Sequence, residues 1–137
     1  MTAAELGAFL RTELPHMFDY DDLTIVHADD RTCQVTHRFR ESMLRPGGTV
    51  SGPTLMALAD CAMYVVLLSA IGPVSLAVTT NLNINFLRKG ALGRDVLAAA
   101  RLLKLGKRLA VGEVTLLSGA SVDPIAHVTA TYSIPNA

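Results

Sequence analysis

The sequence contains no tryptophan, only four phenylalanines and three tyrosines, and no excess of charge of either sign. So few aromatic rings argue against a base-stacking surface for single-stranded nucleic acid. The 12 Lys and Arg residues are balanced by 12 Asp and Glu residues, whereas a nucleic-acid-binding domain normally carries a basic surplus. The composition therefore predicts no nucleic-acid partner.

The sequence has only two cysteines, Cys33 and Cys61, in separate segments without the spacing of metal ligands. We expect both thiols to be reduced and buried, as free cysteines usually are. The histidines are equally scattered and are expected to be structural or exposed, so no metal site is predicted: His16, His27, His37 and His127. The first residues lack the basic start and apolar run of a secretion signal, which favours a cytoplasmic location.

Apolar residues, in contrast, are abundant: 50% of the chain is hydrophobic and 18% is charged. Such a chain is globular rather than disordered. We expect residues 1–137 to form one domain, which buries roughly 68–70% of its unfolded surface without a metal or disulfide. An N-terminal helical extension is predicted within residues 1–20, and Pro15 marks its end. Its apolar residues recur at spacings of three and four: Leu6, Phe9, Leu10 and Leu14.

The longest apolar run, Leu55–Ile71, contains a single charged residue, Asp60. The run falls short of the ~20 residues that cross a bilayer, and a carboxylate is costly there. We therefore interpret it as a helix buried in the protein and expect no membrane partner. Ser51 and Pro53 mark its beginning, and Gly72 marks its end.

Alternation of apolar and polar residues predicts strands on both sides of this helix. The predicted strands cover residues 23–29, 32–39, 76–86, 109–117 and 125–134. Residues 94–105 suit either a strand or a helix, and residues 104–108 are typical of a hairpin turn.

Within residues 76–86, the alternation places Thr79 on a polar face together with three asparagines. The opposite face is expected to meet the core and holds Leu76, Val78, Leu82, Ile84 and Phe86. Strands with short connections around one buried helix predict an α+β fold, in which an antiparallel sheet wraps around that helix. A helix that is apolar on all sides needs cover on all sides, so we expect a second copy of the chain to complete it as a homodimer.

Asp60 is the most informative residue, because a lone carboxylate in an apolar helix is costly to bury unless it is paired or used. One interpretation is a partly exposed or capping carboxylate. The interpretation that we favour is a general base or nucleophile tuned by its apolar neighbours. Ser51 and Gly52 form a second candidate, because the N–H groups of a helix start can bind an anion or a developing oxyanion. A glycine there also lets a carbonyl approach the backbone.

Gly52 and Asp60 are eight residues apart, or roughly 12 Å along a helix axis. This is too far for both to contact one carbonyl group within a single helix. If the two groups act together, Gly52 must come from one subunit and Asp60 from another. The spacing then predicts a site at a dimer interface.

Three segments carry a family resemblance: GGTVSGPTLMALADCAMYVVL, VTTNLNINFLRKGALGRDV and LKLGKRLAVGEV. They resemble the hotdog-fold acyl-CoA thioesterases of the phenylacetate-degradation type, in the 4-hydroxybenzoyl-CoA thioesterase-like superfamily. The resemblance runs from residue 22 to residue 134. It implies a hotdog fold, dimers that pair into a homotetramer, and hydrolysis of acyl-CoA or aryl-CoA thioesters. It also implies no separate cofactor, because coenzyme A is part of the substrate.

By this resemblance, Asp60 would activate water or attack the thioester carbonyl, and the Gly52 amide of the facing subunit would polarise that carbonyl. Thr79 corresponds to a hydroxyl that helps hold the attacking water. Two positions depart from the family pattern. Arg45 stands where an asparagine is usual, and the tripeptide Ser51-Gly52-Pro53 replaces histidine-glycine-glycine. Arg45 then either binds a carboxylate or phosphate of the substrate or is a solvated loop residue.

Several basic residues at strand ends and turns are candidates for contacts with the phosphates of coenzyme A: Arg88, Lys89, Lys104, Lys107 and Arg108. Ordinary solvated surface charge is the alternative for this set. Together with Arg45 and Ser51, these residues make up the predicted substrate-binding group.

Two other functions remain open on the same scaffold. A non-catalytic acyl-CoA or fatty-acyl binding protein would fit the missing asparagine and histidine. An enoyl-thioester hydratase or dehydratase would need a histidine beside the carboxylate. None lies near Asp60 in the sequence, although His27 or His37 could approach it through the fold.

Overall fold

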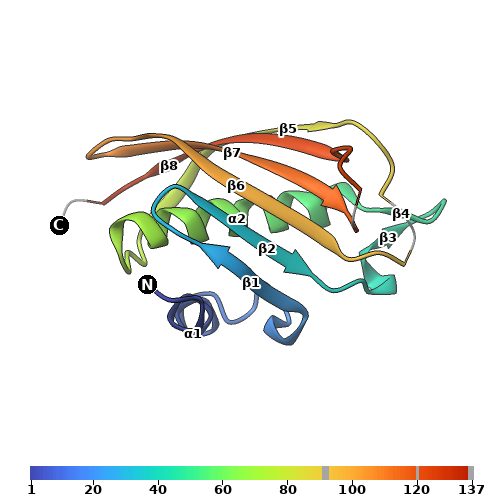
Figure 1. Ribbon diagram of the computed structural model, residues 1–137, viewed down its shortest axis with the longest axis horizontal. Helices are drawn as coiled ribbons and strands as arrows, with labels where there is room; N and C mark the ends of the chain where they lie inside the picture. The colour runs from blue at the N-terminus through green and yellow to red at the C-terminus, as the bar shows by residue number, and fades with distance from the viewer. Residues whose placement is uncertain (91–92, 120, 136–137) are drawn as a thin grey trace.

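The structure, a computed structural model, describes residues 1–90, 93–119 and 121–135. Within them, six antiparallel strands form one sheet that curls over a long central helix, α2 (Gly52–Ile71), as Figure 1 shows. The predicted α+β architecture of a sheet wrapped around one helix is confirmed. In spatial order the strands are β1 (Leu23–Ala28), β2 (Thr32–His37), β6 (Val96–Leu105), β7 (Leu109–Ser118), β8 (Ala126–Ser133) and β5 (Val78–Phe86).

The N-terminal helix α1 (Ala3–Glu13) packs against β1 and α2, and it ends before Pro15 as the sequence predicts. It begins with a reciprocal cap, in which the Glu5 N–H donates to the Thr2 hydroxyl and the Thr2 N–H donates to the Glu5 carboxylate. The remaining elements were not predicted. They are the 3₁₀ turns η1 (Tyr20–Asp22) and η2 (Glu41–Met43) and a two-stranded hairpin of β3 (Leu44–Arg45) and β4 (Thr49–Val50).

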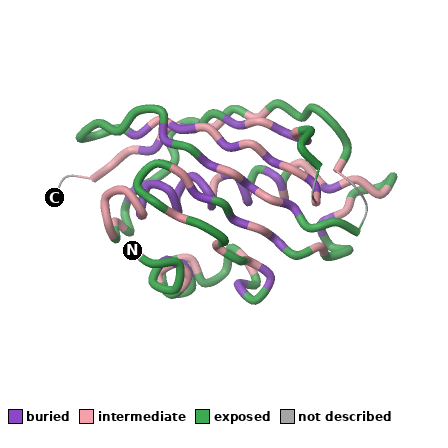
Figure 2. Tube along the Cα trace, in the orientation of Figure 1, coloured by how far each residue is buried: buried purple, intermediate pink, exposed green. Residues whose placement is uncertain are grey.

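Helix α2 begins and ends where the sequence predicts. The Ser51 hydroxyl accepts a hydrogen bond from the Thr54 N–H at 3.3 Å, and Gly72 follows the helix with φ of 88°. By length and composition α2 could cross a membrane, but most of it is buried inside the protein. Its residues 61–68 are buried without a break, and Figure 2 shows this buried stretch beneath the sheet. It is therefore the core helix.

The strands that face α2 alternate between buried and more exposed residues. β8 shows the face predicted for it, with Ala126, Val128, Ala130 and Tyr132 all buried. Residues 94–105, which suit a strand or a helix by sequence, contribute β6 instead of a helix. Because β6 pairs with β2 on one side and with β7 on the other, tertiary hydrogen bonds decide between the two local preferences.

One predicted strand face is wrong at its beginning. The pairing of β5 with β8 shifts register between Thr79 and Asn81, which marks a β-bulge with one extra residue. A bulge reverses the alternation before it. Thr79 therefore faces the helix opposite Tyr132, instead of sharing the polar face with the asparagines. Val78, predicted to face the core, is 56% exposed, and Leu76 is 73% exposed.

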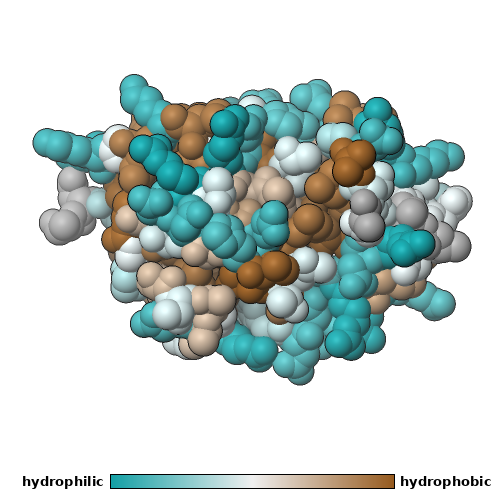
Figure 3. Space-filling view, viewed as in Figure 1, coloured by the Kyte–Doolittle hydropathy of each residue, from teal (hydrophilic) through white to brown (hydrophobic). Residues whose placement is uncertain are grey.

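β5 forms one edge of the sheet, and no other described strand pairs with its outer side. Its inward residues Leu82 and Ile84 are only half-buried, and Phe86, also predicted to face the core, is 54% exposed. Next to this edge, α2 leaves one row of residues at least partly exposed, here called the α2 stripe: Pro53, Met56, Ala57 and Asp60. Figure 3, in the orientation of Figure 1, shows apolar and hydrophilic side chains mixed on the face that it draws. The β5 edge and the α2 stripe together form a surface suited to a partner.

The approach of α2 to the sheet predicts the effect of a substitution at Gly112 in β7. A Cβ at this position would lie 2.5 Å from the Met63 sulfur and 2.9 Å from the Arg101 carbonyl oxygen. We expect Gly112→Ala to destabilise the protein by about 1–3 kcal/mol, because the added methyl overpacks the core. Urea unfolding, followed by circular dichroism, measures the change.

Gly7→Ala is the matched control. Gly7 lies in α1, and a Cβ there meets nothing within 4 Å. This control is expected to be as stable as the parent or more stable by about 0.5–1 kcal/mol, because alanine favours a helix. Equal unfolding midpoints for Gly112→Ala and the parent would contradict the close packing of Met63 on β7.

Candidate active site

Asp60 is the last residue of the α2 stripe, beside the beginning of β5. The Thr79 hydroxyl donates a hydrogen bond to its Oδ1 atom at 2.6 Å, and the Tyr132 hydroxyl donates to the same atom at 2.7 Å. The Tyr132 oxygen also lies 3.1 Å from the Asp60 carbonyl oxygen. Two hydroxyl donors, rather than a cation, therefore offset the cost of placing this carboxylate in an apolar helix.

The sheet positions both donors. Thr79 and Tyr132 are directly opposite each other in β5 and β8, so their side chains lie on the same face. Burial raises the pKa of Tyr132 well above its ordinary value, and the negative charge of Asp60 raises it further. Tyr132 therefore remains a neutral hydrogen-bond donor at physiological pH.

A cavity of about 240 Å³ opens beside Asp60, between α2, the N-terminal segment and the beginning of β5. Its walls are largely apolar, and its described lining includes no histidine, lysine or arginine. Asp60 is thus the only charged group among the residues that line it. The described lining is Leu14, Met17, Asp60, Tyr64, Ser75, Ala77, Val78, Thr79 and Tyr132. Such a cavity suits an uncharged, apolar group that ends at the carboxylate.

A second cavity, of about 410 Å³, opens at the N-terminus of α2. Arg45, Arg88 and Lys89 give its lining positive charge, and the N–H groups of the 20-residue helix add to it. The other lining residues are Thr49, Val50, Gly52, Leu55, Phe86, Leu87 and Gly90. This cavity therefore suits an anionic group such as a phosphate.

Gly52 and Ser51 have different surroundings although they are adjacent. A Cβ on Gly52 would lie 3.1 Å from the ring of Phe86, so only a glycine leaves this contact undisturbed. The Ser51 hydroxyl is engaged by both the N–H and the hydroxyl of Thr54. Ser51, predicted to bind substrate, therefore serves as the helix cap and is absent from the described lining of the cavity. Arg88 donates to the Pro124 carbonyl at 2.7 Å, which fixes it beside that cavity.

The structure divides the predicted basic residues into two groups. Arg45, Arg88 and Lys89 surround the Gly52 cavity. Lys104, Lys107 and Arg108 are exposed residues at the β6–β7 hairpin, at the opposite end of the sheet in Figure 1.

Gly52 and Asp60 open onto separate cavities within one chain. Gly52 packs on Phe86, the last residue of β5, whereas Asp60 binds Thr79 near its beginning. These two positions on the strand are seven residues apart, or about 23 Å in an extended chain.

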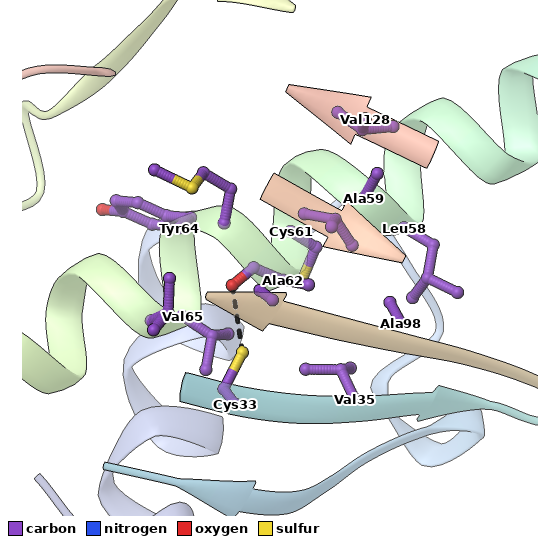
Figure 4. Close-up of a cluster of buried hydrophobic side chains, with 14 of the residues drawn as sticks. Cys33, Val35, Leu58, Ala59, Cys61, Ala62, Tyr64, Val65, Ala98 and Val128 are labelled. Atoms are coloured by element: carbon purple, nitrogen blue, oxygen red, sulfur yellow. Dashed lines mark hydrogen bonds between the residues drawn. The ribbon is translucent and has the colours of Figure 1, made fainter. Parts of the chain in front are cut away.

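Cys61 follows Asp60 in the sequence but points into the core. Figure 4 shows Cys61 and Cys33 within the apolar cluster between α2 and the sheet, where the Cys33 thiol donates to the Ala62 carbonyl at 3.2 Å. Both thiols are free and buried, as predicted. Burial raises the pKa of each to about 12. Neither cysteine is therefore a nucleophile at neutral pH.

The four histidines occupy structural or exposed positions, as predicted. Two of them contact acidic side chains, since His127 lies 3.1 Å from the Glu113 carboxylate and His27 lies 2.9 Å from that of Asp29. His37 contacts the Arg38 carbonyl oxygen. Across residues 1–90, 93–119 and 121–135, no three His, Cys, Asp or Glu side chains gather to hold a metal ion.

Tyr132 is the member of the site that the sequence does not identify. The alternation of β8 correctly places it on the inward face, among alanines and a valine. A buried tyrosine needs a partner for its hydroxyl, and that requirement is the available signal. It does not say which of the polar groups beneath the sheet is the partner.

The family model of the thioesterase superfamily matches residues 47–124, the part of the chain that holds both α2 and Thr79. The chain belongs to the thioesterase superfamily. A candidate thioesterase from Silicibacter sp. TM1040 is 42% identical and superposes with a TM-score of 0.90, over 99% of this chain and 93% of that one. The resemblance drawn from the sequence, including the hotdog fold, is thereby confirmed. No curated protein sequence matches the chain.

Two more distant structures share the fold. The E. coli PaaI protein, from the phenylacetic acid degradation operon, is 22% identical with a TM-score of 0.75, over 95% of this chain and 90% of that one. A protein from Streptococcus mutans UA159, solved bound to acetyl CoA, is 24% identical with a TM-score of 0.76. That alignment covers 83% of this chain and 89% of the other.

The buried cysteines predict a negative result with thiol reagents. The folded protein is expected to react with neither iodoacetamide nor an aromatic disulfide reagent at pH 8, because thiols with a pKa of about 12 are almost wholly protonated. Addition of urea should expose both thiols. Rapid labelling of the folded chain, measured by mass spectrometry, would contradict the burial of Cys33 and Cys61.

Proposed function

We propose that the protein hydrolyses an acyl-CoA or aryl-CoA thioester to the free acid and coenzyme A, with Asp60 as general base or nucleophile. The observation that carries the proposal is the Asp60 carboxylate, held by Thr79 and Tyr132 at the mouth of an apolar cavity. Membership of the thioesterase superfamily supports the reaction class. The acetyl CoA bound by the S. mutans relative supports coenzyme A as the carrier.

The chemistry needs two groups that act on one carbonyl. Asp60 removes a proton from water, or attacks directly, as a bond forms to the carbonyl carbon. The Gly52 N–H donates to the carbonyl oxygen as negative charge develops there. The C–S bond then breaks. After attack by water, the coenzyme A sulfur receives the proton that Asp60 removed. After a direct attack the sulfur leaves as a thiolate, and in a second step water hydrolyses the acyl anhydride on Asp60, restores the carboxylate and supplies the proton for the thiolate. Neither route requires a separate cofactor.

The two groups come from different subunits in this proposal. β5 begins beside Asp60 and ends beside Gly52. When two β5 edges pair antiparallel about a two-fold axis, the beginning of one strand lies next to the end of the other. Asp60 of each subunit then approaches Gly52 of the other, and the α2 stripe gains the cover that an apolar helix needs. A dimer with two identical sites results, and two dimers can pair as a tetramer.

The basic residues suit the phosphates of the carrier. Arg45, Arg88 and Lys89 surround Gly52, so they would lie near the carbonyl group that Gly52 polarises. The same two-fold pairing moves the β6–β7 hairpin of one subunit toward this end of the other, because the hairpin lies at the Asp60 end of the sheet. Lys104, Lys107 and Arg108 would then join the phosphate-binding group.

We place this reaction in the cytoplasm.

A non-catalytic acyl-CoA binding protein is the second candidate. Arg45 and Ser51 stand where related enzymes carry an asparagine and a histidine, and Ser51 is occupied as a helix cap. A hydratase or dehydratase is disfavoured by the site itself, because no histidine lines the described cavity at Asp60.

Asp60→Asn tests the proposed hydrolysis. The amide keeps an oxygen that can accept from Thr79 and Tyr132, but it cannot remove a proton. We expect kcat with a panel of acyl- and aryl-CoA thioesters to fall by about 10²–10⁴-fold while ligand binding persists. Release of free thiol measures turnover, and calorimetry measures binding. Asp30→Asn is the control, because Asp30 is an exposed residue of the β1–β2 turn.

Three outcomes decide between the candidates. Turnover by the parent that is lost in Asp60→Asn and kept in Asp30→Asn supports hydrolysis. Binding of thioesters without turnover by the parent supports the binding protein. Full turnover by Asp60→Asn would eliminate the proposed role of Asp60.

Mixed dimers test the shared site. Asp60→Asn and Gly52→Val are each expected to be inactive, the latter because the larger side chain meets the Phe86 ring and blocks the carbonyl. Co-expression should restore about one quarter of the parent activity, since about half of randomly paired dimers are mixed and each holds one intact site. No restoration in purified mixed dimers would mean that Gly52 and Asp60 do not meet across subunits.

A further inference from the structure

The two hydrogen bonds at Asp60 converge on one oxygen of its carboxylate. Thr79 and Tyr132 both donate to Oδ1, at 2.6 Å and 2.7 Å. No described side chain or N–H group donates to Oδ2. The two oxygens of the carboxylate are therefore unequal: one is held by the protein, and the other can face a reactant.

The two donors also differ in rigidity. Tyr132 is only 3% exposed, and its ring stacks on that of Tyr64 at a centroid distance of 5.9 Å and an interplanar angle of 19°. Thr79, in contrast, lies exposed on the edge strand. The tyrosine hydroxyl is thus fixed from the core side, whereas the threonine hydroxyl can exchange its partner for water or substrate.

We propose that Tyr132 is a positioning residue that locks Asp60 by its Oδ1 atom, so that Oδ2 alone is presented to water or the thioester. This inference rests on the proposed function and deepens it. A rotation of the Asp60 side chain would break the bond to Tyr132, so the bond selects a single orientation. A neutral donor also leaves the full negative charge on the carboxylate, which a Lys or Arg at this position would reduce.

The surroundings of Asp60 make the protonation state a useful readout. The titratable groups around it are Cys61 and Tyr64 on α2 and Tyr132 on β8, and burial raises the pKa of all three. From α1, the Glu13 carboxylate acts on Tyr64. These three neighbours are neutral at pH 5–8, so none of them changes the charge beside the carboxylate in that range.

Tyr132→Phe tests the proposal by removing one oxygen atom. Loss of a donor to a carboxylate favours its protonated form. We expect the low-pH limb of kcat to move to higher pH by about one unit, and kcat at pH 7.5 to fall by about 10-fold, with KM changed less than about twofold. Steady-state thiol release from pH 4.5 to 8.5 measures the pH profile, kcat and KM. The probe is the thioester of the panel that the parent hydrolyses fastest.

Tyr20→Phe is the matched control. Tyr20 is also buried, and its hydroxyl donates to the Leu14 carbonyl at 2.6 Å rather than to the Asp60 carboxylate. We expect it to lower stability without moving the pH profile. If Tyr132→Phe behaves like Tyr20→Phe in both respects, the role of Tyr132 is structural and the proposal is overturned.

Thr79→Val gives a second test that leaves Tyr132 in place. With the tyrosine bond intact, this variant should keep measurable turnover and show a smaller shift of the low-pH limb than Tyr132→Phe. A low-pH limb that moves in Thr79→Val as far as in Tyr132→Phe, or further, would show that Tyr132 is not the residue that holds the carboxylate.

The two proposals fail in different ways. Full turnover by Asp60→Asn overturns the proposed function itself. An inactive Asp60→Asn together with a Tyr132→Phe variant indistinguishable from the parent overturns only the positioning role.

Discussion

Burial of α2 is the constraint on which the rest of the structure depends. Eleven of its twenty residues are buried, so the sheet must curl around it, and the α2 stripe is among the few parts of the helix left accessible. Asp60 lies on this stripe, seven residues after Pro53, where its carboxylate borders a cavity. The packing of this apolar helix therefore places the Asp60 carboxylate beside the edge strand β5, which supplies Thr79 as a hydrogen-bond donor.

That edge strand does so through a local irregularity. The bulge in β5 turns Thr79 inward, opposite Tyr132, and without the extra residue Thr79 would lie on the outer face with the asparagines. Bulges are common beside active sites because they re-aim a single side chain without disturbing the rest of the strand. Here the strand keeps its pairing with β8 up to Phe86. One added residue thus turns Thr79 toward Asp60 while the rest of β5 keeps its pairing with β8.

The local signals of the sequence were sufficient for the helix and for most strands. Ser51 and Gly72 bracket α2, and the lone carboxylate of Asp60 stands out against its apolar neighbours. The bulge could not be predicted, because it appears only in the pairing of two strands distant in the chain. The hydrogen bond from Tyr132 to Asp60 joins residues 72 positions apart in the chain. The alternation of apolar and polar residues within a strand cannot predict a contact over that distance. For the same reason, the basic residues could be recognised as candidates but not sorted into two ends of the sheet.

The position of β5 between the two cavities has a consequence for how activity arises. On the proposed pairing, a newly synthesised chain carries the acid at one end of this strand and the oxyanion donor at the other, and it possesses no complete centre. Only the assembled dimer can then hydrolyse a thioester, and dilution below the dissociation constant of the dimer abolishes this activity. The abundance of the chain would set a threshold for thioester turnover without any separate regulator.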